Sequence, residues 1–375
     1  MRRRLCAEDE YPPGLLAVAG YGLSGALRPF PMEPLGDEAW SALLDAAADH
    51  RVTGLLKVAT ADGAMPATEA QRRAAHAAHR HAQLWVLGLE HALAGVVEVL
   101  EGGGVETRVL KGSAFARLDY ADPAVRSYVD LDLLVRAAQV DRAVALLGEA
   151  GFRRTLAEPR PGFDRRFDKG VTFVAPTGFE LDLHRTFVLG PWGALVDPDR
   201  LWDDGEPFVV GGRSVRALGR SRRFLHACYH AAIGNWPLRL ASLRDVAEHL
   251  RAGQDAREIL EMASAWGVQS LVAAAIADSR RLLGTSGDDA LTAWAHRHRP
   301  TPRDVAWLAL HTRTEKTFAA QALATLSVLA WSDRIGYVRA LLRPSAAYTA
   351  GRHRSARERL AYALRQIRHG TRRVS

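Results

Sequence analysis

The sequence predicts an α+β fold, in which a small mixed β-sheet lies between a helical N-terminal region and a helical C-terminal domain. Apolar residues recur at helical spacing over residues 68–100 and again from residue 221 onward, whereas residues 105–218 contain short segments of alternating apolar and polar residues. The first pattern is typical of amphipathic helices and the second of half-buried strands. The sheet is therefore expected within residues 104–218.

A chain of 375 residues is long enough for two or three packed units. We predict four segments: an N-terminal helical region at 1–103, a sheet-containing core at 104–218, a helical domain at 219–300, and further helices with an arginine-rich tail at 301–375. Thr301-Pro302 marks the boundary before the last segment. The sequence contains no internal repeat.

The net charge of +8 is concentrated at the C-terminus. Residues 351–375 contain eight arginines and a single acid, Glu358, so the rest of the chain is close to neutral. A basic tail can bind nucleic acid or an anionic membrane surface, but it can equally be a solvated end in an arginine-rich chain. Nucleic-acid binding is therefore expected only through this tail.

Cysteine content and the N-terminus point to the cytoplasm. Cys6 and Cys228 are the only cysteines and lie far apart, which favours a reducing compartment. The basic N-terminus is not followed by an apolar stretch, so we expect no signal peptide. The longest apolar segment, 318–331, is too short to cross a bilayer, and no transmembrane segment is expected.

Residues 20–25 read Gly-Tyr-Gly-Leu-Ser-Gly, the spacing of a dinucleotide-binding loop. That loop must open a full-length helix, which Pro29 and Pro31 forbid here. We therefore expect no dinucleotide site.

Two helices are predicted before the sheet, one with Asp37 as its N-cap and one running from its N-cap Thr68 to Leu100. Gly102-Gly103-Gly104 ends the second helix. This helix carries four histidines, at positions 76, 79, 81 and 91. No two are four residues apart and arginines surround them, so a solvated face is expected rather than a metal site.

In the core, strands are predicted at 105–110, 129–135, 152–156, 167–174, 179–183, 208–210 and 214–218. A short helix is expected at 114–118 and a longer one at 137–150. Pro176-Thr177-Gly178 should turn the strands on either side of it into a hairpin. Five helices are then predicted at 221–233, 239–252, 255–266, 269–283 and 288–297, and further helices at 303–342 and around 357–367.

Two acids lie inside an otherwise apolar run at residues 126–135. Alternation with their apolar neighbours puts Asp130 and Asp132 on one face of a strand. Such close carboxylates repel each other unless a cation neutralises them, and Mg²⁺ prefers oxygen ligands. A solvated acidic face is the alternative for an isolated Asp-x-Asp, so neighbouring residues must decide.

The second hairpin strand supplies a third carboxylate. Its residues Glu180, Asp182 and His184 share one face. If this strand lies beside the Asp130 strand, three carboxylates on adjacent strands can hold two metal ions. In-line phosphoryl or nucleotidyl transfer is the chemistry that needs this arrangement.

A polyphosphate substrate also needs a binding loop. Lys111-Gly112-Ser113 stands between a predicted strand and helix, where glycine allows close backbone approach and the serine hydroxyl can bind phosphate oxygens. Lys111 and Arg126 are basic groups able to offset phosphate charge. We assign these four residues to nucleotide binding.

These motifs together resemble the uncharacterised bacterial nucleotidyltransferase family of the DNA-polymerase-β-like nucleotidyltransferase superfamily. The similar segments are Val109–Phe115, Tyr120, Arg126–Val135 and Leu181–His184, and the resemblance covers about residues 80–250. It implies that Gly112 and Ser113 contact the triphosphate and that Asp130 and Asp132 are paired metal ligands. It also implies that Asp182 binds the catalytic-side metal and helps to deprotonate the acceptor.

His226 and His230 stand four residues apart on a predicted helix. Such a pair can bind Zn²⁺, but no glutamate completes a His-Glu-x-x-His motif and no third ligand lies nearby. We assign both, with His184 and Asp245, to the pocket for the acceptor, and we expect Asp245 to reach and orient one of the histidines.

The expected activity is transfer of a nucleoside monophosphate from a nucleoside triphosphate, by default ATP, to a hydroxyl or amine, with release of pyrophosphate. Asp130, Asp132 and Asp182 would bind two Mg²⁺ ions, which Mn²⁺ can replace, and would carry the catalysis. The acceptor can be a small molecule, a peptide or a protein. The alternatives are a non-catalytic protein that binds nucleotide or a partner, and an enzyme directed to RNA by the basic tail.

Overall fold

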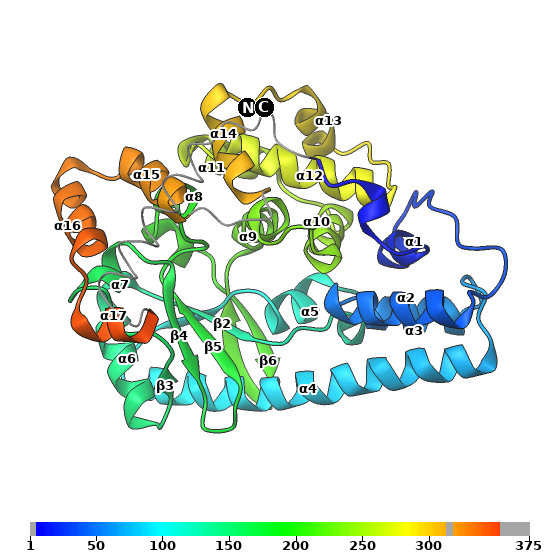
Figure 1. Cartoon of the computed structure of the whole chain (residues 1–375), viewed down its shortest axis with the longest axis horizontal. Coiled ribbons are helices and arrows are strands. Elements are labelled where there is room, and N and C mark those ends of the chain that lie inside the picture. The colour runs from blue at the N-terminus through cyan, green and yellow to red at the C-terminus, as the bar shows by residue number, and fades with distance from the viewer. Residues whose placement is uncertain (1–4, 313–317, 353–375) are drawn as a thin grey trace.

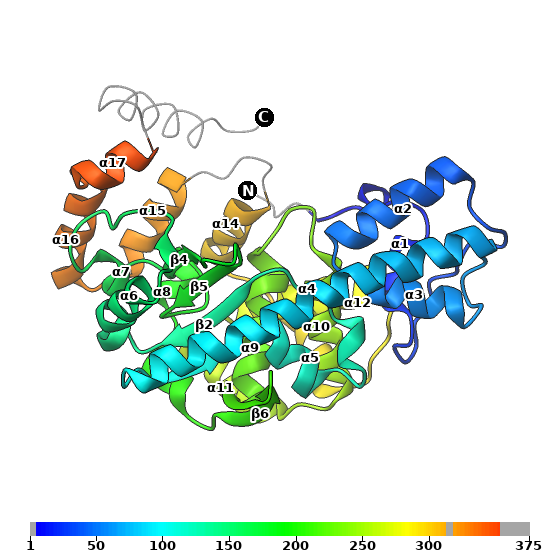
Figure 2. The ribbon, with the colours of Figure 1, turned by 90° about the horizontal axis from the view of Figure 1, so that it is seen from below.

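The computed structural model describes residues 5–312 and 318–352. A seven-stranded sheet lies below the helices of the C-terminal part, and the N-terminal helices lie at one end of the molecule (Figure 1). The long helix α4, Glu69–Gly102, runs along the lower side of the sheet, as Figure 2 shows from below. The predicted α+β fold is confirmed.

The sheet is mixed, as predicted. Its strands are β1 Thr107–Val109, β2 Leu131–Val135, β3 Arg153–Arg154, β4 Gly170–Val174, β5 Glu180–His184, β6 Glu206–Val210 and β7 Arg213–Ala217. Their order across the sheet is β3-β4-β5-β2-β1-β7-β6. β2 pairs with β5 and β1 with β7 in parallel, whereas the other neighbours are antiparallel. The predicted hairpin β4–β5 is present, and β6 and β7 form a second hairpin.

One face of the sheet packs on α4. Apolar residues along this helix, from Val86 to Leu100, share a buried cluster with the leucines of β2 and β5 (Leu131, Leu133, Leu181 and Leu183). Removing these side chains from water holds the helix against the sheet. Because strand residues alternate, Asp132 and Asp182 face away from α4.

α4 begins as the sequence predicts. The Thr68 hydroxyl accepts a hydrogen bond from the Gln71 amide, and the Gln71 side chain accepts one from the Thr68 amide. Among the described residues, α4 alone is long and apolar enough to cross a membrane by length and composition, and 39% of its most apolar window is buried in the protein. The apolar stripe of α4 packs on the sheet. The length and apolar composition of this helix are therefore weak evidence for a membrane span.

The N-terminal region contains α1 Leu15–Gly20, α2 Asp37–Asp49 and α3 Thr53–Ala61, after a short 3₁₀ turn at Glu8–Glu10. The prediction that Asp37 caps α2 is wrong, because Gly36 is the N-cap and Asp37 is the first helical residue. α1 and α3 were not predicted, since α1 is short and wholly buried, and α3 has nine residues of which most are buried, so neither has a clear polar face. Gly20 ends a helix rather than a strand, so residues 20–25 lack the context of a dinucleotide site.

Short elements connect the strands of the core: α5 Ser113–Asp119, α6 Val140–Glu149, α7 Phe163–Arg166, α8 Pro191–Ala194, and 3₁₀ turns at Pro123–Val125, Ala137–Gln139 and Asp199–Trp202. The C-terminal helices are α9 Arg220–Ile233, α10 Leu240–Arg251, α11 Ala256–Ala265, α12 Gln269–Leu283, α13 Ala290–Arg297, α14 Pro302–His311, α15 Phe318–Val328, α16 Trp331–Leu342 and α17 Ala346–Arg352. The five helices predicted between 221 and 297 are present with ends within two residues of those expected. The helix expected around 357–367, and nearly all of the arginine-rich tail, lies outside the described residues.

The N-terminal and C-terminal helices share one hydrophobic core. Leu43 of α2 and Leu56 of α3 belong to the same buried cluster as Leu243 of α10 and Ile276 of α12. Residues before the sheet therefore pack on residues that follow it. The division of the chain at residues 103, 218 and 300 stays a prediction.

Candidate active site

The acidic residues predicted from the sequence meet above one face of the sheet. Asp132 of β2 stands directly beside Asp182 of β5 in the parallel register of the two strands. Asp130 lies one residue before β2, on the same face as Asp132, because one lysine contacts both carboxylates. The expectation that the two strands lie side by side is confirmed.

That lysine is Lys111. Its Nζ lies 3.3 Å from Oδ2 of Asp130 and 2.9 Å from Oδ2 of Asp132. Burial on its own would raise the pKa of Asp132, but the Lys111 ammonium and a hydrogen bond from His184 hold it well below its usual value. Burial likewise opposes the charge on Lys111, and the two carboxylates outweigh it and raise the lysine pKa. Asp132 and Lys111 are therefore both charged at neutral pH.

His184, at the end of β5, points its Nε2 at the carboxylates. Nε2 lies 2.9 Å from Oδ1 of Asp132 and 3.8 Å from Oδ2 of Asp182, while Nδ1 lies 3.2 Å from the carbonyl oxygen of Thr186. A carbonyl can only accept a hydrogen bond, so Nδ1 carries a hydrogen. A cation bound between Nε2 and the carboxylate oxygens would take the place of the hydrogen that Nε2 donates to Asp132, which is the arrangement of a histidine metal ligand held by a backbone carbonyl.

Asp182 has a lysine of its own. Nζ of Lys169 lies 2.6 Å from Oδ2 of Asp182, and the Thr172 hydroxyl donates to the other carboxylate oxygen. Burial would raise the pKa of Asp182, but Lys169 and His184 outweigh it and the pKa is lowered. Lys169 stands outside the motifs recognised in the sequence. The register of the β4–β5 hairpin pairs Thr172 with Asp182 and brings Lys169 close to the same carboxylate. A prediction of this register from the sequence would have indicated Lys169.

A divalent metal fits this group of residues. One ligand atom from each of Asp132, Asp182 and His184 lies within 4.8 Å of the others. Two carboxylate oxygens and an imidazole nitrogen suit ions such as Mn²⁺ or Zn²⁺, and carboxylates with water suit Mg²⁺. This group shares Asp132 and Asp182 with the predicted triad of Asp130, Asp132 and Asp182 and contains His184 in addition. Asp130 is not part of the group, and its role as a metal ligand stays a prediction.

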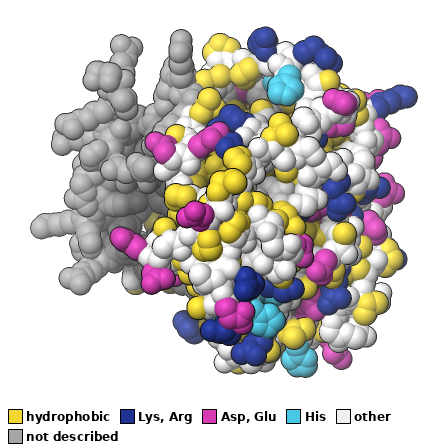
Figure 3. Space-filling model, turned by 90° about the vertical axis from the view of Figure 1, so that its right-hand side faces the viewer, with side chains coloured by type: hydrophobic (Ala, Val, Ile, Leu, Met, Phe, Trp, Pro, Cys, Tyr) yellow, Lys and Arg dark blue, Asp and Glu magenta, His cyan; other side chains and the backbone are white. Residues whose placement is uncertain are grey.

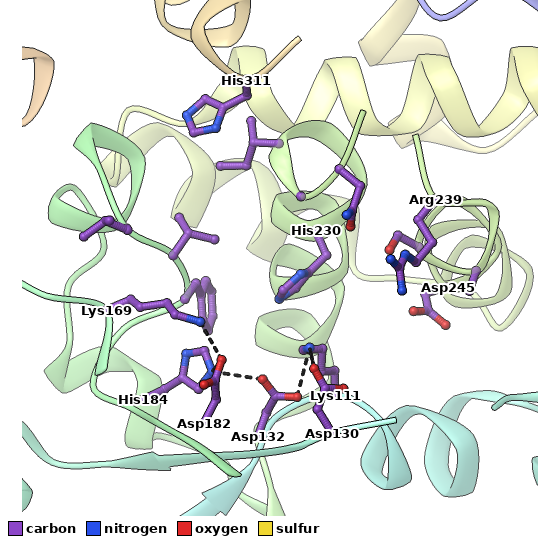
Figure 4. A pocket seen from close by; sticks show the side chains of 18 of the residues that line it. Lys111, Asp130, Asp132, Lys169, Asp182, His184, His230, Arg239, Asp245 and His311 are labelled. Atoms are coloured by element: carbon purple, nitrogen blue, oxygen red, sulfur yellow. Dashed lines mark hydrogen bonds and ion pairs between the residues drawn. The ribbon is translucent and has the colours of Figure 1, made fainter. Parts of the chain in front are cut away.

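These side chains line a cavity of about 470 Å³ between the sheet and the C-terminal helices (Figure 4). Its charged lining residues are Arg51, Lys111, Arg126, Asp130, Asp132, Lys169, Asp182, Arg239 and Asp245. Its apolar lining residues are Phe115, Phe187, Val188, Leu189, Ile233, Trp236 and Leu310. A cavity of this composition can hold a phosphorylated ligand with a less polar part.

Arg126 and Asp245, predicted to bind nucleotide and to line the acceptor pocket, form a buried ion pair with each other, and both also line the cavity. Their contacts with nucleotide and acceptor stay predictions. Nε and Nη2 of Arg126 each donate to the Asp245 carboxylate at 2.8 Å, and the Tyr120 hydroxyl donates to Asp245 at 2.7 Å. The prediction that Asp245 orients one of the two neighbouring histidines is wrong, because its oxygens are used by Arg126 and Tyr120.

Gly112 and Ser113 do not line the cavity. Gly112 has a φ of 61°, and a Cβ there would come within 3.1 Å of the Tyr128 ring, so backbone conformation and packing both require glycine. Ser113 is buried at the start of α5. Their contact with a triphosphate stays a prediction, and Lys111 is the member of this motif that reaches the cavity.

His226, which is buried, and His230, which is half-buried, form a pair on α9 with their Nε2 atoms 3.0 Å apart. One ring must donate and the other accept, so the accepting ring is neutral. Burial holds the pKa of both histidines well below the usual range, which favours the neutral form of the donating ring as well. His230 lines the cavity, whereas His226 packs on Phe187 with ring centroids 4.6 Å apart. Among the described residues, this pair is not part of a metal-ligand group.

A second, shallower hollow lies between α3 and α4. Lys57, Arg72, Arg73, His76 and Arg80 are among its lining residues. Figure 3 shows basic and histidine side chains gathered at the lower edge of this face of the molecule. In the part of the chain that the structure describes, the histidines of α4 are not part of a metal-ligand group.

A mixed sheet that presents carboxylates from adjacent strands to a cationic cavity has the architecture used for transfer of phosphorylated groups. The chain belongs to the uncharacterised nucleotidyltransferase family, whose model matches residues 36–284. The match extends beyond the predicted 80–250 at both ends and takes in Arg51 and helices α9 to α12.

Other similarities are limited. A crystal structure of an antigenic nucleotidyltransferase-like protein from Paracoccidioides brasiliensis is 12% identical and covers 49% of this chain and 93% of that one. Its TM-score of 0.29 is too low to support an inference. No curated protein matches the sequence.

Proposed function

We propose that the protein is a metal-dependent nucleotidyltransferase, which moves a nucleoside monophosphate from a nucleoside triphosphate to a hydroxyl or amine and releases pyrophosphate. The observation that carries this proposal is the register of β2 and β5, which places Asp132 beside Asp182 at the cavity. His184 and Asp130 lie next to this pair. Membership of the family supports the same reaction.

Asp132, Asp182 and His184 would hold a divalent metal, and Asp130 would contribute to a second ion. We propose Mg²⁺, with Mn²⁺ as a substitute. A bound metal of this kind supplies positive charge to the phosphoryl group in transit and makes an acceptor hydroxyl more acidic.

The side chains of the chain itself have separable roles. Lys111, within reach of both Asp130 and Asp132, supplies a cation to phosphate oxygens. Asp182, kept ionised by Lys169, is placed to take the proton of the acceptor. His230 and the apolar residues of the cavity would line the acceptor side.

We propose ATP as the nucleotide and a small molecule, peptide or protein as the acceptor, in the cytoplasm. Cys6 and Cys228 are both free and buried, which suits a reducing compartment. RNA as acceptor would depend on the arginine-rich tail, which lies almost wholly outside the described residues.

A second candidate function is nucleotide binding without catalysis. Lys111 and Lys169 already neutralise Asp132 and Asp182 at 2.9 and 2.6 Å, so the carboxylates are balanced by the chain itself. Binding of a magnesium nucleotide in calorimetry, without turnover on a broad panel of acceptors, would favour this alternative.

The test compares nucleotide-dependent pyrophosphate release by the wild type, by Asp132→Asn and by Asp130→Asn. Asp45→Asn, on the exposed side of α2, is the matched control. We expect the control to keep the activity and Asp132→Asn to lose it by a factor of about 10³ or more, since removing one transition-state charge partner costs several kcal/mol. Unchanged release in both site variants would overturn the proposal.

A further inference from the structure

Three arginines meet on one side of the cavity: Arg51, Arg126 and Arg239. Only Arg126 is neutralised in full, by the buried carboxylate of Asp245. Nη1 of Arg51 lies 3.6 Å from Asp130, a carboxylate that Lys111 also contacts. Among the described residues, no carboxylate lies within ion-pair distance of Arg239. This side of the cavity therefore has more positive than negative charge.

The excess charge is partly removed from water. The pKa of Arg51 is lowered to about 10, chiefly by burial; the positive charges of Arg239 and Arg126 contribute to this lowering, and Asp130 opposes it. Burial also lowers the pKa of Arg239, and repulsion from Arg126 acts in the same direction. Guanidinium groups placed together at a half-buried site repel each other unless an anion lies between them.

The backbone around Arg51 and Arg239 is fixed by a joint, the pair of hydrogen bonds that connects His50 to the first turn of α10. The amide of Ala241 donates to the carbonyl of His50 at 3.2 Å, and the amide of Leu240 donates to Nδ1 of His50 at 3.3 Å. Both are amides of the first turn of α10, which lack partners within the helix. Arg51 follows His50 and Arg239 precedes Leu240, so the joint sets the two arginines on either side of it.

The Arg51 backbone is also unusual. Its φ is 60°, a left-handed conformation that costs energy for a residue with a Cβ. The Ser127 hydroxyl donates to its carbonyl oxygen at 3.3 Å and ties the turn to the segment before β2. The turn is thus held by both the core and α10, with the arginine side chain directed to Asp130.

Figure 4 shows how the cavity is divided. Arg239 lies on the same side as Asp245, whereas Lys169 and His311 lie on the other, and Asp132 and Asp182 lie between them. A chain of phosphates that starts at the carboxylates and extends toward Asp130 would meet Lys111 first and the arginines next.

We propose that Arg51 and Arg239 form a binding site for a polyphosphate chain, the β- and γ-phosphates of the nucleoside triphosphate. The inference rests on the proposed function for the identity of the ligand, but the site itself needs only an anion. The planar fork of arginine matches phosphate oxygens in two-point contacts. Because the two residues come from opposite sides of the joint, a bound polyphosphate also links the N-terminal region to the C-terminal helices.

The test uses inorganic tripolyphosphate, which cannot transfer a nucleotide. Its affinity for the full chain is measured by calorimetry for the wild type, Arg51→Gln, Arg239→Gln and Arg239→Lys. Arg257→Gln is the matched control, because Arg257 is exposed on α11 and pairs with Glu261 at 2.8 Å. We expect about tenfold or greater loss for each glutamine variant, a smaller loss for Arg239→Lys, and no change for the control.

Thermal unfolding separates binding from folding. Within residues 5–312 and 318–352, Arg239 has no carboxylate at ion-pair distance, so Arg239→Gln should unfold no earlier than the wild type, whereas a purely structural role would lower the melting temperature. Equal tripolyphosphate affinity in the wild type and Arg239→Gln would overturn the inference. If the wild type shows no nucleotide turnover and the glutamine variants still lose tripolyphosphate binding, the anion site stands and the proposed function is rejected. If Arg239→Gln turns over the nucleotide at the normal rate with an unchanged KM, the proposed function stands and the polyphosphate site is rejected.

Discussion

The Arg126 guanidinium holds the Asp245 carboxylate through two hydrogen bonds of 2.8 Å, across 119 residues of chain. Both side chains are at most 5% exposed. The contact joins the segment before β2 to helix α10, and it uses charges that the sequence had suggested for substrate. A buried ion pair of this kind fixes the relative position of two parts of a protein.

Breaking this pair should therefore destabilise the protein. We expect Asp245→Ala to lower the free energy of unfolding by about 3–5 kcal/mol, because it leaves the Arg126 charge buried without a partner. Urea denaturation measures the change. The double variant Arg126→Met with Asp245→Leu removes both charges and should recover most of the stability. A loss below about 1 kcal/mol for Asp245→Ala would show that the pair is solvated in solution.

His184 should influence which metal binds. Imidazole nitrogen favours Mn²⁺ over Mg²⁺ relative to a site made of oxygen ligands alone, so His184→Asn should weaken Mn²⁺ binding by about tenfold and Mg²⁺ binding less. Calorimetric titration of both ions in the absence of nucleotide measures this. His296→Asn, on the exposed surface of α13, serves as the control. Equal Mn²⁺ affinity in wild type and His184→Asn would remove the histidine from the metal site.

Acid should destabilise the protein below about pH 6.5, in part through His249. Burial lowers the pKa of this histidine to about 3, and the nearby Arg223 acts in the same direction. The unfolded chain, with an ordinary histidine pKa, binds the proton first, so stability is lost as the pH falls through this window.

For this one residue, the loss at pH 5.5 should be about 1.4 kcal/mol relative to pH 7.5. Urea denaturation of wild type and His249→Leu at the two pH values measures it. Neither ring nitrogen of His249 has a hydrogen-bond partner among the described residues, so an apolar replacement is tolerable. The pH-dependent loss should be smaller in the variant by that amount, and an identical loss in both proteins would contradict the assignment.

Local pattern determined much of the fold. Period-2 alternation located β2 and β5 and predicted that Asp132 and Asp182 face the same side as their polar neighbours. The helical period located α4 and the five helices from α9 to α13 to within two residues. These features depend on residues close together in the chain, where backbone geometry alone fixes which side chains share a face.

The partners of charged residues were decided by the tertiary structure. Sequence could place Arg126 and Asp245 near a site, but only the packing of α10 on the core showed that they neutralise each other. Lys169 was brought to Asp182 by the register of the β4–β5 hairpin. No periodicity encodes such a contact, because it depends on how separate elements pack.

The same reason explains why Arg51 and Arg239 were missed. One follows a helix of the N-terminal region and the other precedes α10, and neither lies in a motif. The sequence by itself determined the acidic strands and the kind of chemistry they support. Only the fold, by docking His50 on the start of α10, decided which cations share the cavity with them.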